Sequence, residues 1–209
     1  MTEVPRYRAV IFDLGGVVLD SPLAAIAAYE AANAIPSGAV NRAVANRGAN
    51  SAWARHERGE IDFASFCEQW EAELAEEGLV VEAAEVMARI EMTLRPRPRL
   101  LDLIRGLRRR GIKVGAITNS WKTLGDAGID DEFDVVVHSW REGVRKPEPA
   151  IYHLALQRLG VKGPEAVYLD DIGANLKPAQ ELGMKTFKVT DEEAAVTFLA
   201  SLLGSLSAP

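Results

Sequence analysis

The sequence has few of the features that mark secreted or membrane proteins. It holds one cysteine, Cys67, among 209 residues, so no disulfide forms within the chain and nothing indicates an oxidising compartment. No apolar run reaches the ~18 residues that a membrane-spanning helix needs. Residues 1–10 contain no apolar stretch of the kind found in a secretion signal. These absences predict a cytoplasmic protein without a membrane partner.

The chain also has fewer basic than acidic residues. The chain carries 24 Lys and Arg against 30 Asp and Glu, which gives a net charge of −6 and a pI of about 5.2. An acidic surface repels a phosphate backbone, which argues against a nucleic-acid partner, and the basic stretch Arg105–Arg110 is too short to reverse this. With 48% hydrophobic and 26% charged residues, the composition suits a globular small-molecule enzyme with one domain and a sizeable insertion.

Short apolar runs alternate with helical patterns along much of the chain. Several runs are typical of buried parallel strands, and the first of them ends in an acid and two glycines. The predicted strands are Arg8–Asp13, Lys113–Thr118, Phe133–His138, Ala166–Asp170 and Lys185–Val189. The helices predicted around them are Pro98–Arg110, Pro149–Leu159, Asn175–Leu182 and Glu192–Leu203. This alternation predicts an α/β fold with a doubly wound, Rossmann-like parallel sheet covered on both faces.

The interval between the first two predicted strands is far longer than a single crossover helix requires. It is rich in alanine and glutamate, and apolar residues recur in it at helical spacing. The segments with this spacing are Leu23–Ala34, Gly38–Asn46, Asp62–Glu77 and Val81–Thr93. We therefore expect a helical cap at residues 21–95, inserted into a Rossmann-like core made of residues 1–20 and 96–209.

Polar residues stand at the carboxyl ends of three predicted strands, where ligands bind in open parallel sheets. Asp13 follows the first strand, Thr118 and Asn119 follow the second, and Asp170 and Asp171 follow the fourth. Carboxylates gathered at one edge raise each other's pKa unless a cation lies between them. Because all the ligand atoms would be oxygens, the cluster predicts a hard ion such as Mg²⁺.

The same edge of the sheet offers groups suited to an anion. Backbone N–H groups at Gly15 and Gly16 and the hydroxyl of Thr118 are expected to approach phosphate oxygens. Lys146 lies just before a predicted helix and supplies a positive point charge. A nucleophilic carboxylate, Asp13, together with a hydroxyl, a lysine and an acid pair suits phosphoryl transfer, in which positioning and charge neutralisation do most of the catalysis.

These residues form four ordered motifs: Phe12–Val17, Ile117–Ser120, Lys146–Pro147 and Leu169–Asn175. In order, spacing and strand-end placement they resemble the haloacid dehalogenase-like hydrolase superfamily over nearly the whole chain. The segments Asp170–Met184, Ile35–Gly38 and Arg58–Ile61 are similar to the phosphatase domain of soluble epoxide hydrolases. They also resemble the related domain fused to some acyl-CoA dehydrogenases and small bacterial sugar-phosphate phosphatases.

The resemblance implies a Mg²⁺-dependent phosphatase in which Asp13 attacks phosphorus and forms an aspartyl-phosphate that water hydrolyses. The implied metal ligands are Asp13, the Gly15 carbonyl and Asp171, with Asp170 and Asn175 in support. The implied phosphoryl-binding groups are Thr118, the Asn119 amide and Lys146. A small phosphorylated metabolite is the expected partner of a monomer or homodimer. Sugar phosphates, lipid phosphates and other phosphorylated metabolites all remain open.

One position departs from the family pattern. Most phosphatases of the superfamily carry a second aspartate two residues beyond the nucleophile, as the general acid and base, whereas this chain has Gly15. General acid–base catalysis contributes ~10²–10⁴ in rate. Asp20, Asp170, His56 and solvent are candidate substitutes, although the simpler interpretation places His56 on a solvated face.

Two other functions stay open beside the phosphatase. Haloacid dehalogenases keep the same nucleophile but attack carbon, lack the second aspartate and need no metal; the Asp170–Asn175 signature speaks against them. A catalytically silent domain that binds a phosphorylated ligand or a partner protein would also explain the missing acid at Gly15.

Overall fold

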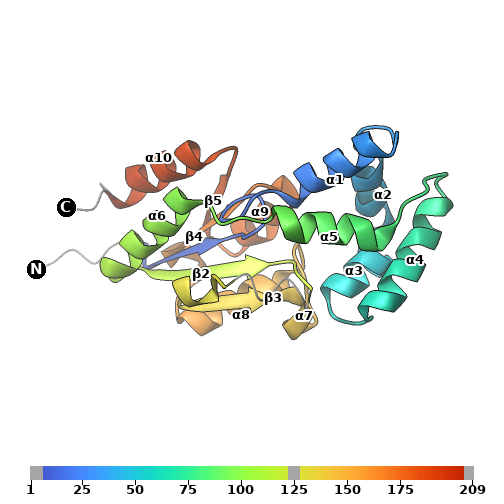
Figure 1. Cartoon of the computed structure of the whole chain (residues 1–209). Helices are drawn as coiled ribbons and strands as arrows, with labels where there is room; N and C mark the ends of the chain where they lie inside the picture. The colour runs from blue at the N-terminus through green and yellow to red at the C-terminus, as the bar shows by residue number, and fades with distance from the viewer. Residues whose placement is uncertain (1–6, 122–127, 205–209) are drawn as a thin grey trace, which may run out of the picture.

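The computed structural model describes residues 7–121 and 128–204. Within these residues, parallel strands form one five-stranded sheet with the order β3-β2-β1-β4-β5. The strands are β1 (Ala9–Phe12), β2 (Lys113–Thr118), β3 (Val135–His138), β4 (Ala166–Asp170) and β5 (Lys185–Lys188). β1 is therefore central, and the chain winds outward from it first to one side and then to the other (Figure 1). The predicted doubly wound α/β fold is confirmed.

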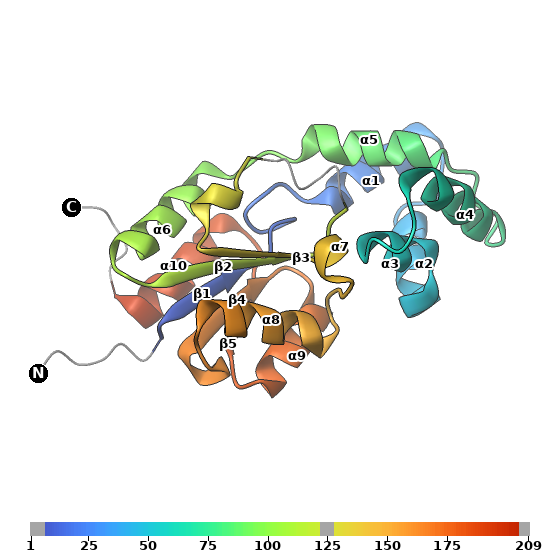
Figure 2. The same ribbon diagram turned by 90° about the horizontal axis from the view of Figure 1, so that it is seen from below.

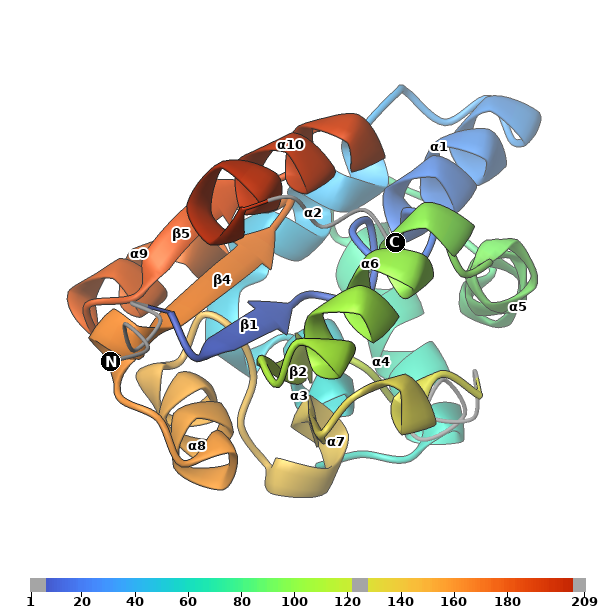
Figure 3. The ribbon, with the colours of Figure 1, turned by 90° about the vertical axis from the view of Figure 1, so that its left-hand side faces the viewer.

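Helices cover both faces of the sheet. The two on one face are α6 (Pro98–Arg109) and α10 (Glu192–Leu203), and the two on the other are α8 (Pro149–Leu159) and α9 (Gly173–Glu181). Figure 2 shows the sheet nearly edge-on between α6 and α8, and Figure 3 shows β1 in the middle of the layers. The strand side chains alternate between the two cores: Val10 and Phe12 pack under α6 and α10, while Ala9 and Ile11 face α8 and α9.

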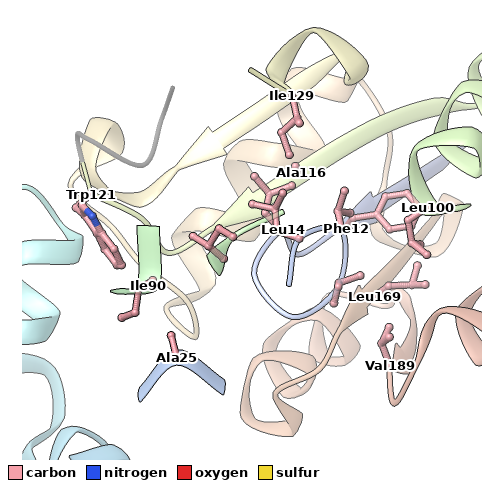
Figure 4. Close-up of a cluster of buried hydrophobic side chains, with 14 of the residues drawn as sticks. Phe12, Leu14, Ala25, Ile90, Leu100, Ala116, Trp121, Ile129, Leu169 and Val189 are labelled. Atoms are coloured by element: carbon pink, nitrogen blue, oxygen red, sulfur yellow. The ribbon is translucent and has the colours of Figure 1, made fainter. Parts of the chain in front are cut away.

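Residues between β1 and β2 form a group of helices beyond the carboxyl edge of the sheet, which we call the insert (Figure 1). Its α-helices are α1 (Pro22–Ala32), α2 (Ala39–Arg47), α3 (Ala52–Glu57), α4 (Phe63–Ala75) and α5 (Ala83–Thr93). The apolar cluster of the core face continues into the insert without a break. In Figure 4, Phe12 and Leu169 of the sheet belong to the same cluster as Ile90 and Ala25 of the insert.

Two short helices of the structure have no counterpart among the sequence predictions. They are α3, which has six residues, and α7 (Ser139–Glu142), which has four. Helices of one or two turns show no repeating apolar stripe, so periodicity gives no signal for them. α3 begins at Ser51, whose Oγ accepts a hydrogen bond from the Ala54 N–H at 3.2 Å. α3 borders the candidate site described below, and α7 packs against α3.

In residues 7–121 and 128–204, every helix is too short or too polar to cross a bilayer.

Candidate active site

Three neighbouring strands deliver the predicted site residues to one place. Asp13 directly follows β1, Thr118 is the last residue of β2, and Asp170 is the last residue of β4. Because β1 pairs with both β2 and β4 in parallel, these three strand ends lie at the same edge of the sheet. All three side chains are buried, at 5%, 3% and 0% exposure respectively.

The acids form a compact cluster. One oxygen each from Asp13, Asp170 and Asp171 lies within 4.8 Å of the others. Oδ1 of Asp171 is buried and has no hydrogen-bond partner among the residues that the structure describes. A buried carboxylate oxygen without a partner is costly, so the position calls for a cation.

Lys146 lies against this cluster and is 2% exposed. Its Nζ is 2.6 Å from Oδ1 of Asp13 and 3.0 Å from Oδ2 of Asp170. Burial alone would lower the pKa of Lys146, but the adjacent carboxylates outweigh burial and raise it. The ammonium is therefore charged and binds the two acids together.

One lysine does not neutralise three carboxylates. Burial raises the pKa of Asp13 well above its usual value, and Asp170 and Asp171 raise it further against the opposing effect of Lys146. Burial and the charge of Asp170 likewise raise the pKa of Asp171. A divalent cation between these acids would offset the remaining negative charge.

The two adjacent acids differ in their surroundings. Asp170 is surrounded by donors: besides Lys146, its oxygens accept hydrogen bonds from the Tyr168 hydroxyl at 2.5 Å, the Ile172 N–H at 2.7 Å and the Asn175 amide at 3.1 Å. Asp171 keeps a free oxygen. Asp170 thus suits the role of orienting Lys146, whereas Asp171 suits direct metal binding.

Gly16 has a different place in the site from the one expected. Its N–H, which we expected to bind phosphate, donates to the carbonyl oxygen of Leu19 at 3.0 Å. The residue has a φ of +86°, and a Cβ built there would lie 2.3 Å from Oδ2 of Asp171. Glycine is therefore required here for the backbone conformation and for close approach to Asp171.

Asn119 binds the main chain of Lys146. Its Oδ1 accepts from the Lys146 N–H at 2.8 Å, and its Nδ2 donates to the Lys146 carbonyl oxygen at 3.0 Å. The side-chain amide of Asn119 is thus engaged with the main chain of Lys146. This pair of hydrogen bonds joins the second motif to the third across 27 residues of sequence.

A cavity of about 440 Å³ opens over Asp13, Thr118 and Lys146, between the sheet edge and the insert. Its floor is polar, but most of its wall is apolar. The apolar side chains of the wall are Leu14, Leu19, Leu23, Ile26, Val44, Trp53, Ile90, Leu94, Trp121, Ile129 and Ile172. Such a mixture fits a ligand with a charged head and an apolar body.

The structure also bears on the substitutes for the missing acid at Gly15. Asp20 and His56 are not among the described residues that line the cavity. His56 is buried at 8% exposure and stacks on Phe66 with ring centroids 4.4 Å apart, so the interpretation that it lies on a solvated face is wrong. Apolar neighbours from α4 explain the burial.

No motif or spacing in the sequence predicted a role for several residues near the site. Glu57 and Arg145 line the cavity and form an ion pair at 2.5 Å. His138 lies between Ser120 and Asp130, with 3.2 Å from Ser120 Oγ to Nδ1 and 2.9 Å from Nε2 to Asp130. Their only signal was proximity to motifs: Arg145 precedes Lys146, and Ser120 ends the second motif.

The fold and this site define a class of protein. The family model of haloacid dehalogenase-like hydrolases matches residues 7–183, and the chain belongs to that family. It is therefore an enzyme of the hydrolase class.

Individual relatives agree with this assignment. The chain is 37% identical to acyl-CoA dehydrogenase family member 10 of Mus musculus over 205 residues, and 32% identical to bifunctional epoxide hydrolase 2 of Sus scrofa over 217 residues. These alignments cover 95% and 94% of this chain but only 19% and 39% of the relatives. The predicted resemblance is confirmed, and the chain spans well under half the length of these two relatives.

Two further comparisons cover nearly whole molecules. Sesquiterpene phosphatase astK of Aspergillus oryzae is 28% identical over 207 residues, which cover 95% of this chain and 97% of that protein. A family enzyme of Bacteroides thetaiotaomicron, solved as a complex with magnesium and inorganic phosphate, has a TM-score of 0.63 at 21% identity, covering 87% of this chain and 93% of that one. The latter likeness supports the fold.

Proposed function

We propose that this protein is a Mg²⁺-dependent phosphatase of small phosphate monoesters with an apolar leaving group. The observation that carries the proposal is the buried cluster of Asp13, Asp170 and Asp171, with Lys146 at 2.6 Å from the first of them. Phosphoryl transfer needs positioning and charge neutralisation, and this cluster is arranged for both.

The residues present fit a magnesium ion. Asp171 has an unpartnered buried oxygen, Gly16 leaves room beside it, and the candidate ligands are all oxygens. Asp13, Asp171 and the Gly15 carbonyl would hold the ion, with Asp170 and Asn175 in support. When bound, Mg²⁺ supplies positive charge against the phosphate oxygens and orients them for attack.

The side chains then divide the chemistry between them. Oδ1 of Asp13 is occupied by the Leu14 N–H and by Lys146, both at 2.6 Å, so we assign the attack on phosphorus to Oδ2. The new O–P bond makes an aspartyl-phosphate while the bond to the ester oxygen breaks, and the leaving alkoxide takes a proton from solvent. Water then attacks that phosphorus and releases phosphate and free Asp13. Thr118 and Lys146 hold the phosphoryl oxygens.

The cavity wall supports an apolar leaving group. Leu23 and Ile172 are 43% and 45% exposed and border the cavity, and Trp53, Trp121 and the other apolar side chains continue its wall. A sugar offers hydroxyl groups that such a wall leaves without partners, which costs binding energy. A full-length relative named for its action on sesquiterpene phosphates agrees with this preference.

A nucleophile substitution tests the mechanism. With p-nitrophenyl phosphate, whose leaving group needs no proton, Asp13→Asn is expected to lower kcat at least about 1,000-fold because the amide cannot form the O–P bond. EDTA should abolish turnover of the unaltered protein and Mg²⁺ should restore it. Asp102→Asn is the matched control, since Asp102 lies outside the cavity in an exposed ion pair with Arg105 at 3.4 Å.

Four results would reject the proposal. The first is full activity of Asp13→Asn, and the second is full activity in EDTA. The third is halide release from a 2-haloacid without Mg²⁺, which would establish a dehalogenase instead. Protection of the fold by beryllofluoride without turnover of any phosphate ester would leave a silent phosphoryl-binding domain.

A further inference from the structure

Glu57 joins the insert to the catalytic edge of the sheet. It is the last residue of α3 and is buried at 6% exposure. Oε2 of Glu57 accepts hydrogen bonds from Arg145 Nε at 2.5 Å and from Asn119 Nδ2 at 3.3 Å, while Oε1 accepts from Trp53 Nε1 at 2.9 Å. One carboxylate from the insert thus contacts two residues of the core.

Both core partners of Glu57 are directly connected to Lys146. Asn119 binds the N–H and the carbonyl oxygen of Lys146, as described above, and Arg145 is its neighbour in the chain. Because Nδ2 of Asn119 donates to Glu57 as well as to the lysine carbonyl, Glu57 favours the same orientation of the amide group as the Lys146 main chain does. The reversed amide would place its oxygen against the Glu57 carboxylate.

The end of α3 is itself firmly seated on the core. Ser139 Oγ of α7 donates to the Glu57 carbonyl oxygen at 2.6 Å. Gly59 follows with a φ of +69°, and a Cβ built on it would lie 2.6 Å from the Trp140 carbonyl oxygen. The position of the Glu57 carboxylate therefore reports how the insert is docked.

We propose that Glu57 is a positioning residue that couples docking of the insert to the placement of Lys146 against Asp13. The inference rests on the proposed phosphatase function, in which Lys146 holds the phosphoryl group. Glu57 acts through Asn119, which binds the main chain that carries Lys146, while Arg145 holds the Glu57 carboxylate against the core. Docking of the insert thus aligns the leaving group, which the insert contacts, with the phosphoryl group, which Lys146 holds.

The contacts of Glu57 argue against a role as the missing general acid. Both of its oxygens accept hydrogen bonds, and the guanidinium of Arg145 lies directly against one of them. A carboxylate with both oxygens engaged by such donors is held in one orientation by its partners. Its contribution is geometric.

Kinetics of Glu57 variants test the coupling. Glu57→Ala is expected to lower kcat for p-nitrophenyl phosphate about tenfold to a hundredfold, with a smaller change in KM, because Lys146 loses its alignment in the transition state. Glu57→Gln keeps the volume but retains one acceptor oxygen, so its loss should be smaller. Glu60→Gln is the matched control, since Glu60 pairs with Arg58 at 2.6 Å on the exposed side of the same segment.

A double variant separates positioning from simple loss of structure. If Glu57 acts through Asn119, the variant with both Glu57→Ala and Asn119→Ala has a kcat within about threefold of Asn119→Ala alone. Independent effects would multiply instead. Multiplying effects, or an unchanged kcat in both Glu57 variants at an unchanged melting temperature, would overturn the inference.

Amide exchange gives a readout that needs no turnover. The Lys146 N–H is protected by Oδ1 of Asn119, so Glu57→Ala is expected to speed its hydrogen exchange about tenfold, and Glu60→Gln to leave it unchanged. If Asp13→Asn shows that the phosphatase proposal is wrong, this measurement still decides whether Glu57 positions Lys146. Exchange unaltered in both Glu57→Ala and Glu57→Gln would reject the coupling. If Glu57→Ala fails to fold, Glu57→Gln alone decides both readouts.

Discussion

At the scale of single residues, the site depends on a glycine beside an acid. Gly16 has a positive φ and would place a Cβ 2.3 Å from Asp171 Oδ2, so any side chain there must displace the free carboxylate. Arg97 also holds the loop after β1, because its guanidinium donates a hydrogen bond to the Gly16 carbonyl oxygen at 2.9 Å. The second glycine of the first motif thus positions Asp171 at the edge where we propose that the metal binds.

Gly16→Ala is therefore expected to impair the site beyond its effect on stability. Displacement of Asp171 should weaken Mg²⁺ binding and lower kcat/KM at least about tenfold. Mutation of residues that orient a metal ligand typically costs at least that much in metal affinity or activity. Gly111→Ala is the control, since Gly111 has a φ of +75° and open space around its Cβ position. Both variants carry the cost of a left-handed alanine, about 1–2 kcal/mol. Titration calorimetry with Mg²⁺ and kinetics distinguish them, and equal Mg²⁺ affinity in the two would contradict the account.

At the scale of elements, the insert is held together by rings packed between α3 and α4. Phe66 and Trp70 of α4 lie fully inside, and His56 of α3 stacks on Phe66 at an interplanar angle of 16°. Nδ1 of His56 is 3.3 Å from the Ile61 carbonyl oxygen, but its Nε2 is buried without a partner in the described part of the chain. A histidine in this position is favoured in its neutral form.

This packing predicts a pH dependence of stability. Burial lowers the pKa of His56, so near and below the ordinary value of about 6.5 the unfolded chain binds more protons than the folded one. His56 should therefore contribute a fall in the free energy of unfolding as the pH drops from 7.5 to 5.5, against the opposite contribution of Asp13 and Asp171, whose pKa values are raised in the fold. His56→Phe removes the titrating ring and should show a smaller fall in urea unfolding. His153→Gln, at an exposed position on α8, should match the unaltered protein, and equal falls in all three would refute the assignment.

At the scale of the whole molecule, the ligand cavity is shared between the insert and the core. The polar floor comes from strand ends, and much of the apolar wall comes from α1, α2, α3 and α5. Chemistry and selectivity are thus carried by different parts of the chain. Changes in the wall should alter which ester is hydrolysed while the phosphoryl-transfer step remains intact.

Leu23 and Met92 offer a matched test of that division. Both are exposed residues of the insert, at 43% and 63%, but only Leu23 lines the cavity. Leu23→Ser should lower kcat/KM for a long-chain alkyl phosphate about tenfold, the value of burying one or two methylenes, and leave p-nitrophenyl phosphate nearly unaffected. Met92→Ser should change neither. A glucose phosphate preferred over alkyl phosphates by the unaltered enzyme would contradict the apolar leaving group.

The sequence by itself was enough for the sheet, most helices and the meeting of Asp13, Thr118 and Asp170. Apolar runs and stop signals are local, and the carboxyl ends of adjacent parallel strands converge at one edge whatever the details of packing. The tertiary structure alone decided which acid of the pair keeps a free oxygen, that the Gly16 N–H is engaged, and that Glu57 reaches Asn119 across 62 residues. Those outcomes depend on the exact course of loops and the contacts of individual side chains, which leave no periodic trace in the chain.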